Sequence, residues 1–298
     1  MKKVVAYIIM TATIFATMEV ALKIGGNNLD PLQLTGLRFL IGGLVLAPFA
    51  VLESRKSGYI LNLRDFGWLA LVGIMGIPLS MLAFQLGVMR CNAATASVLI
   101  CTNPLFAMLI AHAFTSEKMD TRKWIAFVLG IIAIFFMVRP WDVQEGNTVA
   151  GMLIMMFAAV TFGAYSVMGK RSIARIGTFT QTSISFITGS IILLVITAAT
   201  GRPVFSGVAD NLAVVIYCGI VVTGIGYLLY FLAIKNSDAT TGSITFFIKP
   251  AIAPAFAVLI LYETVYWNTI TGIIILIAAS VITISDTVIR RRQALQNA

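Results

Sequence analysis

The sequence predicts an all-α membrane protein in which ten transmembrane helices form two inverted five-helix repeats. Three observations support this fold class: a composition too poor in charge for a soluble globule, ten apolar runs of membrane-spanning length, and matching residues that recur about 147 positions apart. The matches divide the chain into a first repeat over residues 1–141 and a second repeat over residues 148–298.

The composition places most of the surface in lipid. Hydrophobic residues make up 59% of the 298 positions, charged residues make up 11%, and the mean hydropathy is +0.96. Soluble domains carry about 25% charged residues because their surface faces water. The net charge of +9 does not indicate a nucleic-acid partner, because the basic residues lie in short clusters between apolar runs. Cys91, Cys101 and Cys218 form no CxxC pair, so we expect buried thiols and no disulfide, metal or cofactor.

Ten apolar runs approach the ~20 residues that a helix needs to cross a bilayer. The first run follows Met1-Lys2-Lys3 and could be a signal peptide, but no small-residue cleavage site appears before Glu19 and Lys23. We therefore expect it to be the first spanning helix. The ten predicted spans lie near residues 4–23, 33–52, 66–89, 93–115, 122–139, 149–169, 178–200, 210–234, 239–261 and 267–289.

The distribution of lysine and arginine predicts the orientation. With ten spans, 15 of the 21 basic residues fall on one side of the membrane and 4 on the other, while Arg38 and Lys249 lie inside spans. The positive-inside rule makes the richer side cytoplasmic. We expect a multi-pass protein of the inner (plasma) membrane with both termini in the cytoplasm.

The internal repeat has two registers. An offset of 147 relates Phe15 to Phe162, Lys23 to Lys170, Thr35 to Thr182, Phe39 to Phe186 and Gly42 to Gly189; an offset of 146 relates Gly73 to Gly219, Thr95 to Thr241, Ser97 to Ser243, Pro104 to Pro250 and Glu117 to Glu263. Because each repeat has an odd number of spans, the second copy enters the membrane upside down. Inverted repeats are common in secondary transporters, where two similar halves open a central site to one side and then to the other.

These residues resemble the drug/metabolite transporter superfamily, specifically its EamA-type members, over essentially the whole chain. The matching patterns are Phe15 to Lys23, Leu37-Arg38-Phe39, Ala93 to Ser97, Pro104 and Glu117, then Phe162 to Lys170, Ala239 to Ser243, Pro250 and Glu263. The chain departs from the family by having Phe15-Ala16 in place of Trp-Gly, and Ser116-Glu117 and Tyr262-Glu263 in place of Gly-Glu. The resemblance implies that helices 1–4 and 6–9 surround a central cavity, with helices 5 and 10 at the periphery or at a homodimer contact.

Glu19, Arg38 and Lys249 lie well inside apolar spans. A charge at mid-membrane costs about 2.5–3.5 kcal/mol on insertion scales, so these side chains should face protein or water. Either they bind substrate or they form a buried ion pair that fixes helix packing. Arg38 is near the outer face, where we expect a structural or gating role with the side chain reaching toward the interface.

Lys249 directly precedes a helix break, because Pro250 removes the backbone bond to the carbonyl of Phe246 and Pro254 repeats the defect one turn later. A broken helix is tolerated beside protein or an aqueous cavity, where a cation suits a carboxylate or phosphate. We expect structural or gating roles for Pro104, Pro250 and Pro254. Further substrate-site candidates are Asn103 (the repeat mate of Lys249), Ser166 (the mate of Glu19), Thr102, Gln85, Tyr165, Tyr227, Tyr230 and Phe246.

The leading functional hypothesis is an exporter or exchanger of a small polar metabolite, with an amino acid or similar zwitterion held between Glu19 and Lys249. A proton that competes for Glu19 would couple transport to protons. The alternative cargo is an anionic phosphorylated sugar or nucleotide sugar. An intramembrane enzyme would need a nucleophile–base pair or clustered metal ligands, and a channel would need a continuous polar pore; the sequence displays neither.

Overall fold

The computed structural model describes residues 2–139, 141–236 and 245–296, and within these residues all regular secondary structure is helical. Eight helical segments are long and apolar enough to cross a membrane, and two shorter apolar helices cover Ile248–Leu261 and Trp267–Ala279. The eight segments are Lys2–Gly26, Pro31–Ser57, Leu63–Val88, Ala93–Phe114, Thr121–Val138, Val149–Ile173, Thr178–Ala199 and Leu212–Ile234. The predicted start of the ninth span, residues 239–244, lies outside the described residues.

Several of these segments are interrupted, so the chain contains more helices than apolar runs. In order they are α1 (Lys2–Ala16), α2 (Met18–Gly26), α3 (Pro31–Ser57), α4 (Leu63–Ile74), η1 (Met75–Met81), α5 (Leu82–Val88), α6 (Ala93–Ile100), α7 (Asn103–Phe114), α8 (Thr121–Val138), α9 (Val149–Ile176), α10 (Thr178–Ala199), α11 (Leu212–Ile216), η2 (Tyr217–Ile225), α12 (Gly226–Lys235), α14 (Thr245–Leu261) and α15 (Trp267–Gln296).

The interruptions have local causes. The first run breaks at Thr17, whose hydroxyl bonds the carbonyl of Ile14 and contacts the hydroxyl of Tyr217 at 2.6 Å. The fourth run breaks just before Pro104, because the proline ring prevents the preceding turn from continuing as a regular helix. The third run contains the π-helical segment η1 and the eighth run contains η2. A π-helical turn is wider than an α-helical turn and is frequent at functional sites. Each break lies near the middle of its run.

Polar caps set the helix ends. The carboxylate of Asp30 accepts the amide of Leu32 at the start of α3, and Asn62 and Asp65 form a reciprocal capping box at the start of α4. Such caps satisfy amide groups that have no partner inside the helix.

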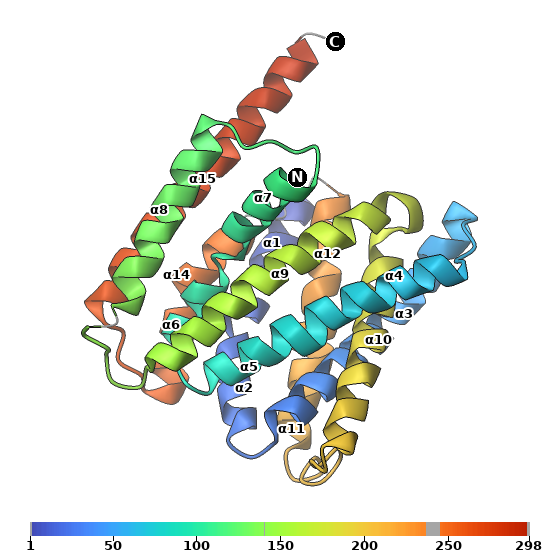
Figure 1. Ribbon diagram of the computed structural model, residues 1–298, viewed down its shortest axis with the longest axis horizontal. Helices are drawn as coiled ribbons and strands as arrows, with labels where there is room; N and C mark the ends of the chain where they lie inside the picture. The colour runs from blue at the N-terminus through green and yellow to red at the C-terminus, as the bar shows by residue number, and fades with distance from the viewer. Residues whose placement is uncertain (1, 140, 237–244, 297–298) are drawn as a thin grey trace.

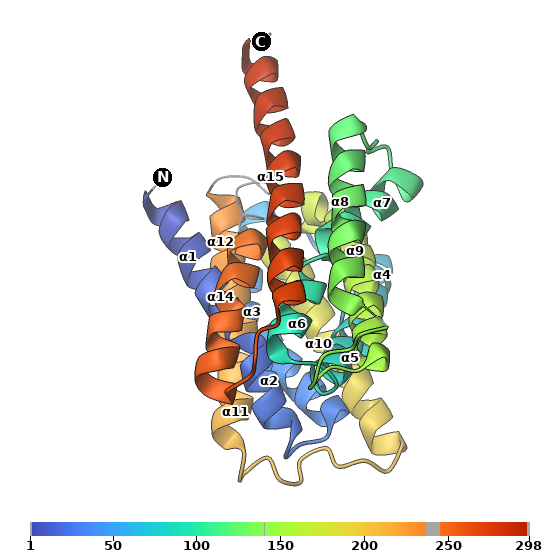
Figure 2. The same cartoon turned by 90° about the vertical axis from the view of Figure 1, so that its left-hand side faces the viewer.

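The helices form one bundle with a pair set at its edge (Figure 1). α8 and α15 pack against each other on one side of the bundle, as the family resemblance implied for helices 5 and 10, and Figure 2 shows them from that side. α1 begins and α15 ends at the same end of the bundle.

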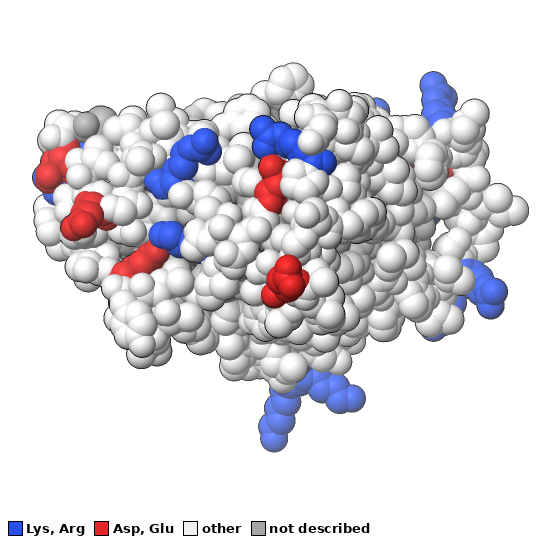
Figure 3. Space-filling model, turned by 90° about the horizontal axis from the view of Figure 1, so that it is seen from below, with Lys and Arg blue, Asp and Glu red and all other residues white. Residues whose placement is uncertain are grey.

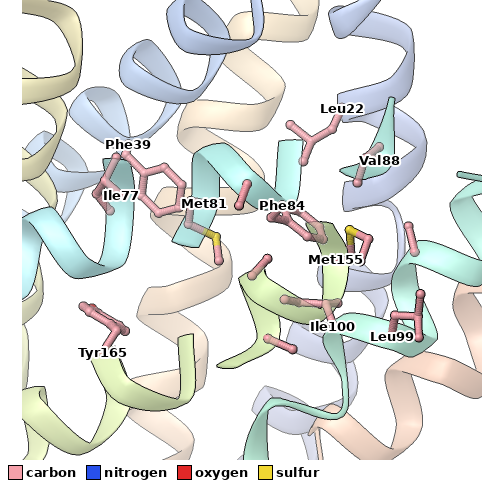
Figure 4. Packing of buried hydrophobic residues seen from close by; sticks show 14 of the residues in the cluster. Leu22, Phe39, Ile77, Met81, Phe84, Val88, Leu99, Ile100, Met155 and Tyr165 are labelled. Carbon is pink, nitrogen blue, oxygen red and sulfur yellow. The ribbon is translucent and has the colours of Figure 1, made fainter. Parts of the chain in front are cut away.

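Glycines allow α4 and α10 to pack closely against each other. A Cβ added at Gly73 would lie 2.5 Å from the carbonyl oxygen of Ser185 and 2.9 Å from the amide of Gly189, so this crossing requires glycine. Around it lies a core of apolar side chains (Figure 4), including Phe39, Ile77 and Phe84, all at most 1% exposed.

The outer surface is mostly uncharged. Large apolar side chains such as Leu153, Leu259 and Ile274 are 59–71% exposed. Charged side chains of both signs are scattered over a largely uncharged surface at the end that carries the α2–α3 turn and α11 (Figure 3). The exposed apolar side chains fit a lipid solvent.

Candidate functional site

An ion pair between Glu19 and Lys249 lies in the centre of the bundle. Lys249 Nζ donates to Glu19 Oε1 at 2.5 Å, and the two side chains are 2% and 1% exposed. Glu19 lies in the first turn of α2, directly after the break at Thr17, and Lys249 precedes Pro250 in α14. The structure therefore brings together the two residues that the sequence placed on opposite sides of a cavity.

A small cavity of about 30 Å³ adjoins this pair. It has room for about one water molecule, so a substrate requires the site to widen. Its lining side chains come from both repeats: Phe15, Met18, Met81, Phe84, Ile100, Asn103, Phe162, Tyr227, Phe246 and Lys249.

The cavity lining follows the repeat. Four of its pairs are related by the sequence offsets of 147 or 146: Phe15 with Phe162, Met81 with Tyr227, Ile100 with Phe246, and Asn103 with Lys249. Equivalent positions of the two halves thus meet at one point. In the second repeat that point carries a cation, whereas the first repeat presents the amide of Asn103.

An aromatic cluster surrounds one side of the cavity. The Phe15 ring lies 5.2 Å from the ring of Tyr227 and 6.3 Å from that of Phe246, and Tyr230 stacks edge-on against Phe246 at 5.6 Å. Two methionines, Met18 and Met81, complete this flexible apolar lining. The site therefore combines a charged pair with an apolar wall that can adapt its shape.

Arg38 in α3 points into the protein, not toward the interface, and is 1% exposed. Its Nη1 lies 3.8 Å from the Met18 sulfur, and its guanidinium carbon lies 4.4 Å from the centre of the Phe39 ring. Among the described residues its Nε and Nη2 have no hydrogen-bond partner, and neither has Glu19 Oε2. In the described part of the chain, the centre of the bundle thus holds two cations and one carboxylate, which leaves a formal excess of one positive charge.

Some predicted site residues lie elsewhere. Gln85 donates to the carbonyl of Leu22 at 3.1 Å and ties α5 to α2. Thr102 bonds the carbonyl of Leu99 within its own helical run. Tyr165 packs over Gly76, and Ser166, which bonds the carbonyl of Phe162, lines a different cavity.

Sequence reasoning missed much of the apolar lining: Phe15, Met18, Met81, Phe84, Ile100 and Phe162 were not among the candidates. The repeat offset was an available signal for Met81 and Ile100, because they are the mates of the candidates Tyr227 and Phe246.

A second, larger cavity of about 930 Å³ lies between α4, α7 and α9, toward the end of the bundle where α1 begins. It is lined by Trp68, Ala107, Met108, Ile110, Ala111, Phe114, Thr115, Glu117, Ala164, Ser166, Val167, Met168, Lys170 and Arg171. Phe162, Ser166 and Lys170 follow one another at four-residue spacing on α9, so one helix face connects the small cavity to the large one.

A bundle of membrane-length helices around a buried charged pair, with discontinuous helices at that pair, is the architecture of a membrane transporter. Comparison with protein families identifies the transporter family to which the chain belongs. The EamA-like transporter family matches residues 2–139 and again residues 149–285, and the chain belongs to this family.

Relatives agree with this assignment. The chain is similar to an uncharacterized transporter of Clostridium kluyveri, with 36% identity over 96% of this chain and 94% of that protein. It is also similar to the uncharacterized transporter YoaV of Bacillus subtilis, at 25% identity over 93% and 94%, and to a chloroplastic WAT1-related protein of Arabidopsis thaliana, at 24% identity over 85% and 61%. A solved crystal structure with 16% identity superposes with a TM-score of 0.67 over 98% of this chain and 99% of the other, and shows the same fold. The protein is thus a multi-pass membrane transporter, and its family is not one of enzymes.

Proposed function

We propose that this protein is a secondary active transporter that moves a small zwitterionic metabolite, with amino acids as the best-fitting class, by alternating access. The observation that carries the proposal is the buried Glu19–Lys249 pair beside a cavity lined by equivalent positions of both repeats. Charged residues in membrane spans mark substrate and ion pathways. Symmetric halves around one site are the requirement for opening that site to each side in turn.

The proposed topology has ten spans in two inverted repeats. The protein lies in the plasma membrane, and both of its termini are in the cytoplasm. Two matches to the family model and the 15-to-4 division of basic residues support it. Under this topology the cavity of about 930 Å³ opens to the cytoplasm.

In the proposed binding mode the substrate inserts itself into the ion pair. Its ammonium group contacts Glu19, its carboxylate contacts Lys249, and its apolar body lies against Phe15, Tyr227 and Phe246. Breaking the pair without replacement would leave two buried charges unsatisfied. A zwitterion replaces both partners at once, so an entering amine or an isolated acid is a poorer substrate.

Glu19 also supplies a route for proton coupling. It is the carboxylate of the central site, and its Oε2 has no partner among the described residues. A proton on Glu19 would remove the attraction for both Lys249 and a substrate ammonium. Proton and substrate would then compete for one group, which is the requirement for antiport.

A second candidate function is favoured by Arg38. Its two unpartnered nitrogens and the excess positive charge of the centre suit an anionic cargo such as a phosphorylated sugar or nucleotide sugar. In that case Lys249 and Arg38 together would hold the phosphate, and Glu19 would serve only to position Lys249.

The experiment that separates the candidates is a ligand panel screened by thermal shift on purified protein, followed by counter-flow of the hits in liposomes. Zwitterionic hits that lose binding in both Glu19→Gln and Lys249→Ala support the first proposal. Anionic hits that survive Glu19→Gln but not Arg38→Met support the second. Hits whose binding is unchanged in Lys249→Ala would overturn the site, and flux without counter-flow would indicate a channel.

A further inference from the structure

A cluster of polar contacts closes the end of the bundle opposite the large cavity. Lys23 Nζ lies 2.5 Å from Glu263 Oε1 and 3.0 Å from the carbonyl oxygen of Cys91. The other carboxylate oxygen of Glu263 accepts the backbone amide of Ala93 at 2.7 Å. Because Ala93 is the first residue of α6, this carboxylate lies where the positive end of the helix dipole favours it. The pair thus ties α2, the end of α14 and the start of α6 together.

Apolar side chains seal the same end beneath the ion pair. Val20, Ala93, Ala94 and Ala257 are at most 3% exposed and form one cluster. Phe256, Leu261 and Val265 pack against it. This cluster leaves the start of α6 wedged between α2 and α14.

The other end carries the repeat mates of the same charged residues in a different setting. Lys170 is the mate of Lys23 and Glu117 is the mate of Glu263. They are also paired at 2.5 Å, but their side chains are 70% and 50% exposed, compared with 24% and 9% for Lys23 and Glu263. The mates of Cys91 and Ala93 are residues 237 and 239, which lie outside the described residues.

Four residues of the apolar seal have repeat mates that line the large cavity. Val20 corresponds to Val167, Phe256 to Ile110, Ala257 to Ala111, and Leu261 to Thr115, and all four of these mates border the space of about 930 Å³. Four positions that pack in the seal of one half therefore border the large cavity in the other half.

We infer that the Lys23–Glu263 and Lys170–Glu117 pairs are the two gates of the transporter, and that this structure is its inward-open state with the outer gate docked on α6. The inference rests on the proposed alternating access and names the residues that select each state. When the halves exchange conformations, Lys23–Glu263 separates from α6 and becomes exposed, while Lys170–Glu117 becomes buried. Each pair stabilises only the state in which it is docked.

Thiol labelling at two matched positions tests this inference without any knowledge of the substrate. In a background with Cys91→Ala, Cys101→Ala and Cys218→Ala, one variant carries Ala257→Cys in the outer seal and another carries Ala111→Cys in the inner cavity. A membrane-impermeant methanethiosulfonate reagent is applied to right-side-out and inside-out vesicles. Because Ala111 borders the large cavity whereas Ala257 is 0% exposed, we expect Ala111→Cys to label faster from the cytoplasmic side than Ala257→Cys labels from outside.

Adding Glu263→Gln should raise the outside rate of Ala257→Cys about tenfold and lower the inside rate of Ala111→Cys, because a charge-assisted contact that holds the inward-open state is lost. Glu117→Gln is the matched control, since the same chemical change at the inner gate should leave the Ala257→Cys rate low. Lys23→Gln should reproduce Glu263→Gln.

Equal rates with and without Glu263→Gln, or a rise in Ala257→Cys labelling with Glu117→Gln, would overturn the gate assignment. A variant that fails to fold is recognised because both positions then label from both sides. If Glu263→Gln raises the Ala257→Cys rate and lowers the Ala111→Cys rate in a protein that binds no zwitterion, the gate assignment stands and the proposed substrate is rejected. If zwitterion counter-flow is intact but Glu263→Gln changes neither labelling rate, the proposed substrate stands and the gate assignment is rejected.

Discussion

Glu19 and Lys249 are separated by 230 positions in the chain, yet their charged groups lie 2.5 Å apart and almost completely out of reach of solvent. A buried ion pair is weak evidence for stability, because desolvation offsets most of the attraction between the charges. Its position at the junction of the two repeats agrees with the binding mode that we propose, in which the pair keeps two polar groups compatible with an apolar bundle until a substrate replaces the contact.

The first prediction concerns the stability of this pair. Lys249→Met alone should lower the free energy of unfolding by about 3–5 kcal/mol, because it leaves Glu19 buried without its partner. The double variant with Glu19→Gln and Lys249→Met should recover most of that loss. Thermal unfolding in one detergent measures both. A double variant as unstable as the sum of its single variants would mean that the two charges act independently.

The second prediction concerns proton coupling. Glu19→Gln removes the titratable carboxylate but keeps its size, so transport that depends on a proton at this site should lose its pH dependence. Uptake or counter-flow of the identified substrate at several pH values is the measurement. Ser166→Ala, at the repeat mate of Glu19, is the matched control and should keep the wild-type profile. A Glu19→Gln protein with an unchanged pH profile would remove Glu19 from the coupling role.

The sequence predicted the charged centre of the site better than its walls. Glu19 and Lys249 were identifiable because a charge inside an apolar span is costly and therefore has a reason to be there. Apolar liners such as Met81 and Phe84 belong to residue types that face lipid as often as a cavity. Only the structure shows the rotation of each helix about its axis.

Two polar candidates, Thr102 and Gln85, lie outside the lining of the small cavity. Thr102 satisfies its hydroxyl on the nearby carbonyl of Leu99, and the amide nitrogen of Gln85 donates to the carbonyl of Leu22, so each has a structural reason to lie in a span. The helical bundle itself followed from run length and composition. The π-helical turns of η1 and η2 did not, because a widened turn leaves no strong mark in a sequence of mostly apolar residues.

The third prediction concerns the crossing of α4 and α10. Gly73→Ala should lower stability by about 1–3 kcal/mol, since the new methyl group meets backbone atoms of Ser185 and Gly189, which cannot move aside as a flexible side chain can. Gly67→Ala is the control within the same helix, because a Cβ there meets nothing within 4 Å. Thermal unfolding of both variants should show a loss for Gly73→Ala only. Equal stability of the two would mean that the crossing is looser than the structure indicates.

The last prediction concerns the inverted topology. Residues 118–123 and 170–175 belong to different repeats, yet Lys170 pairs with Glu117 and Arg175 pairs with Asp65 at one end of the bundle. Single cysteines at Lys118 and Arg171 should therefore label from the cytoplasmic side, and one at Asp210 should label from outside. The native thiols give little background: Cys91, Cys101 and Cys218 are buried, and burial raises the pKa of Cys91 to about 11, which keeps this thiol protonated near neutral pH. Labelling of Lys118→Cys and Arg171→Cys from opposite faces of the membrane would exclude inverted repeats, and alternating access around a shared centre would then have no structural basis.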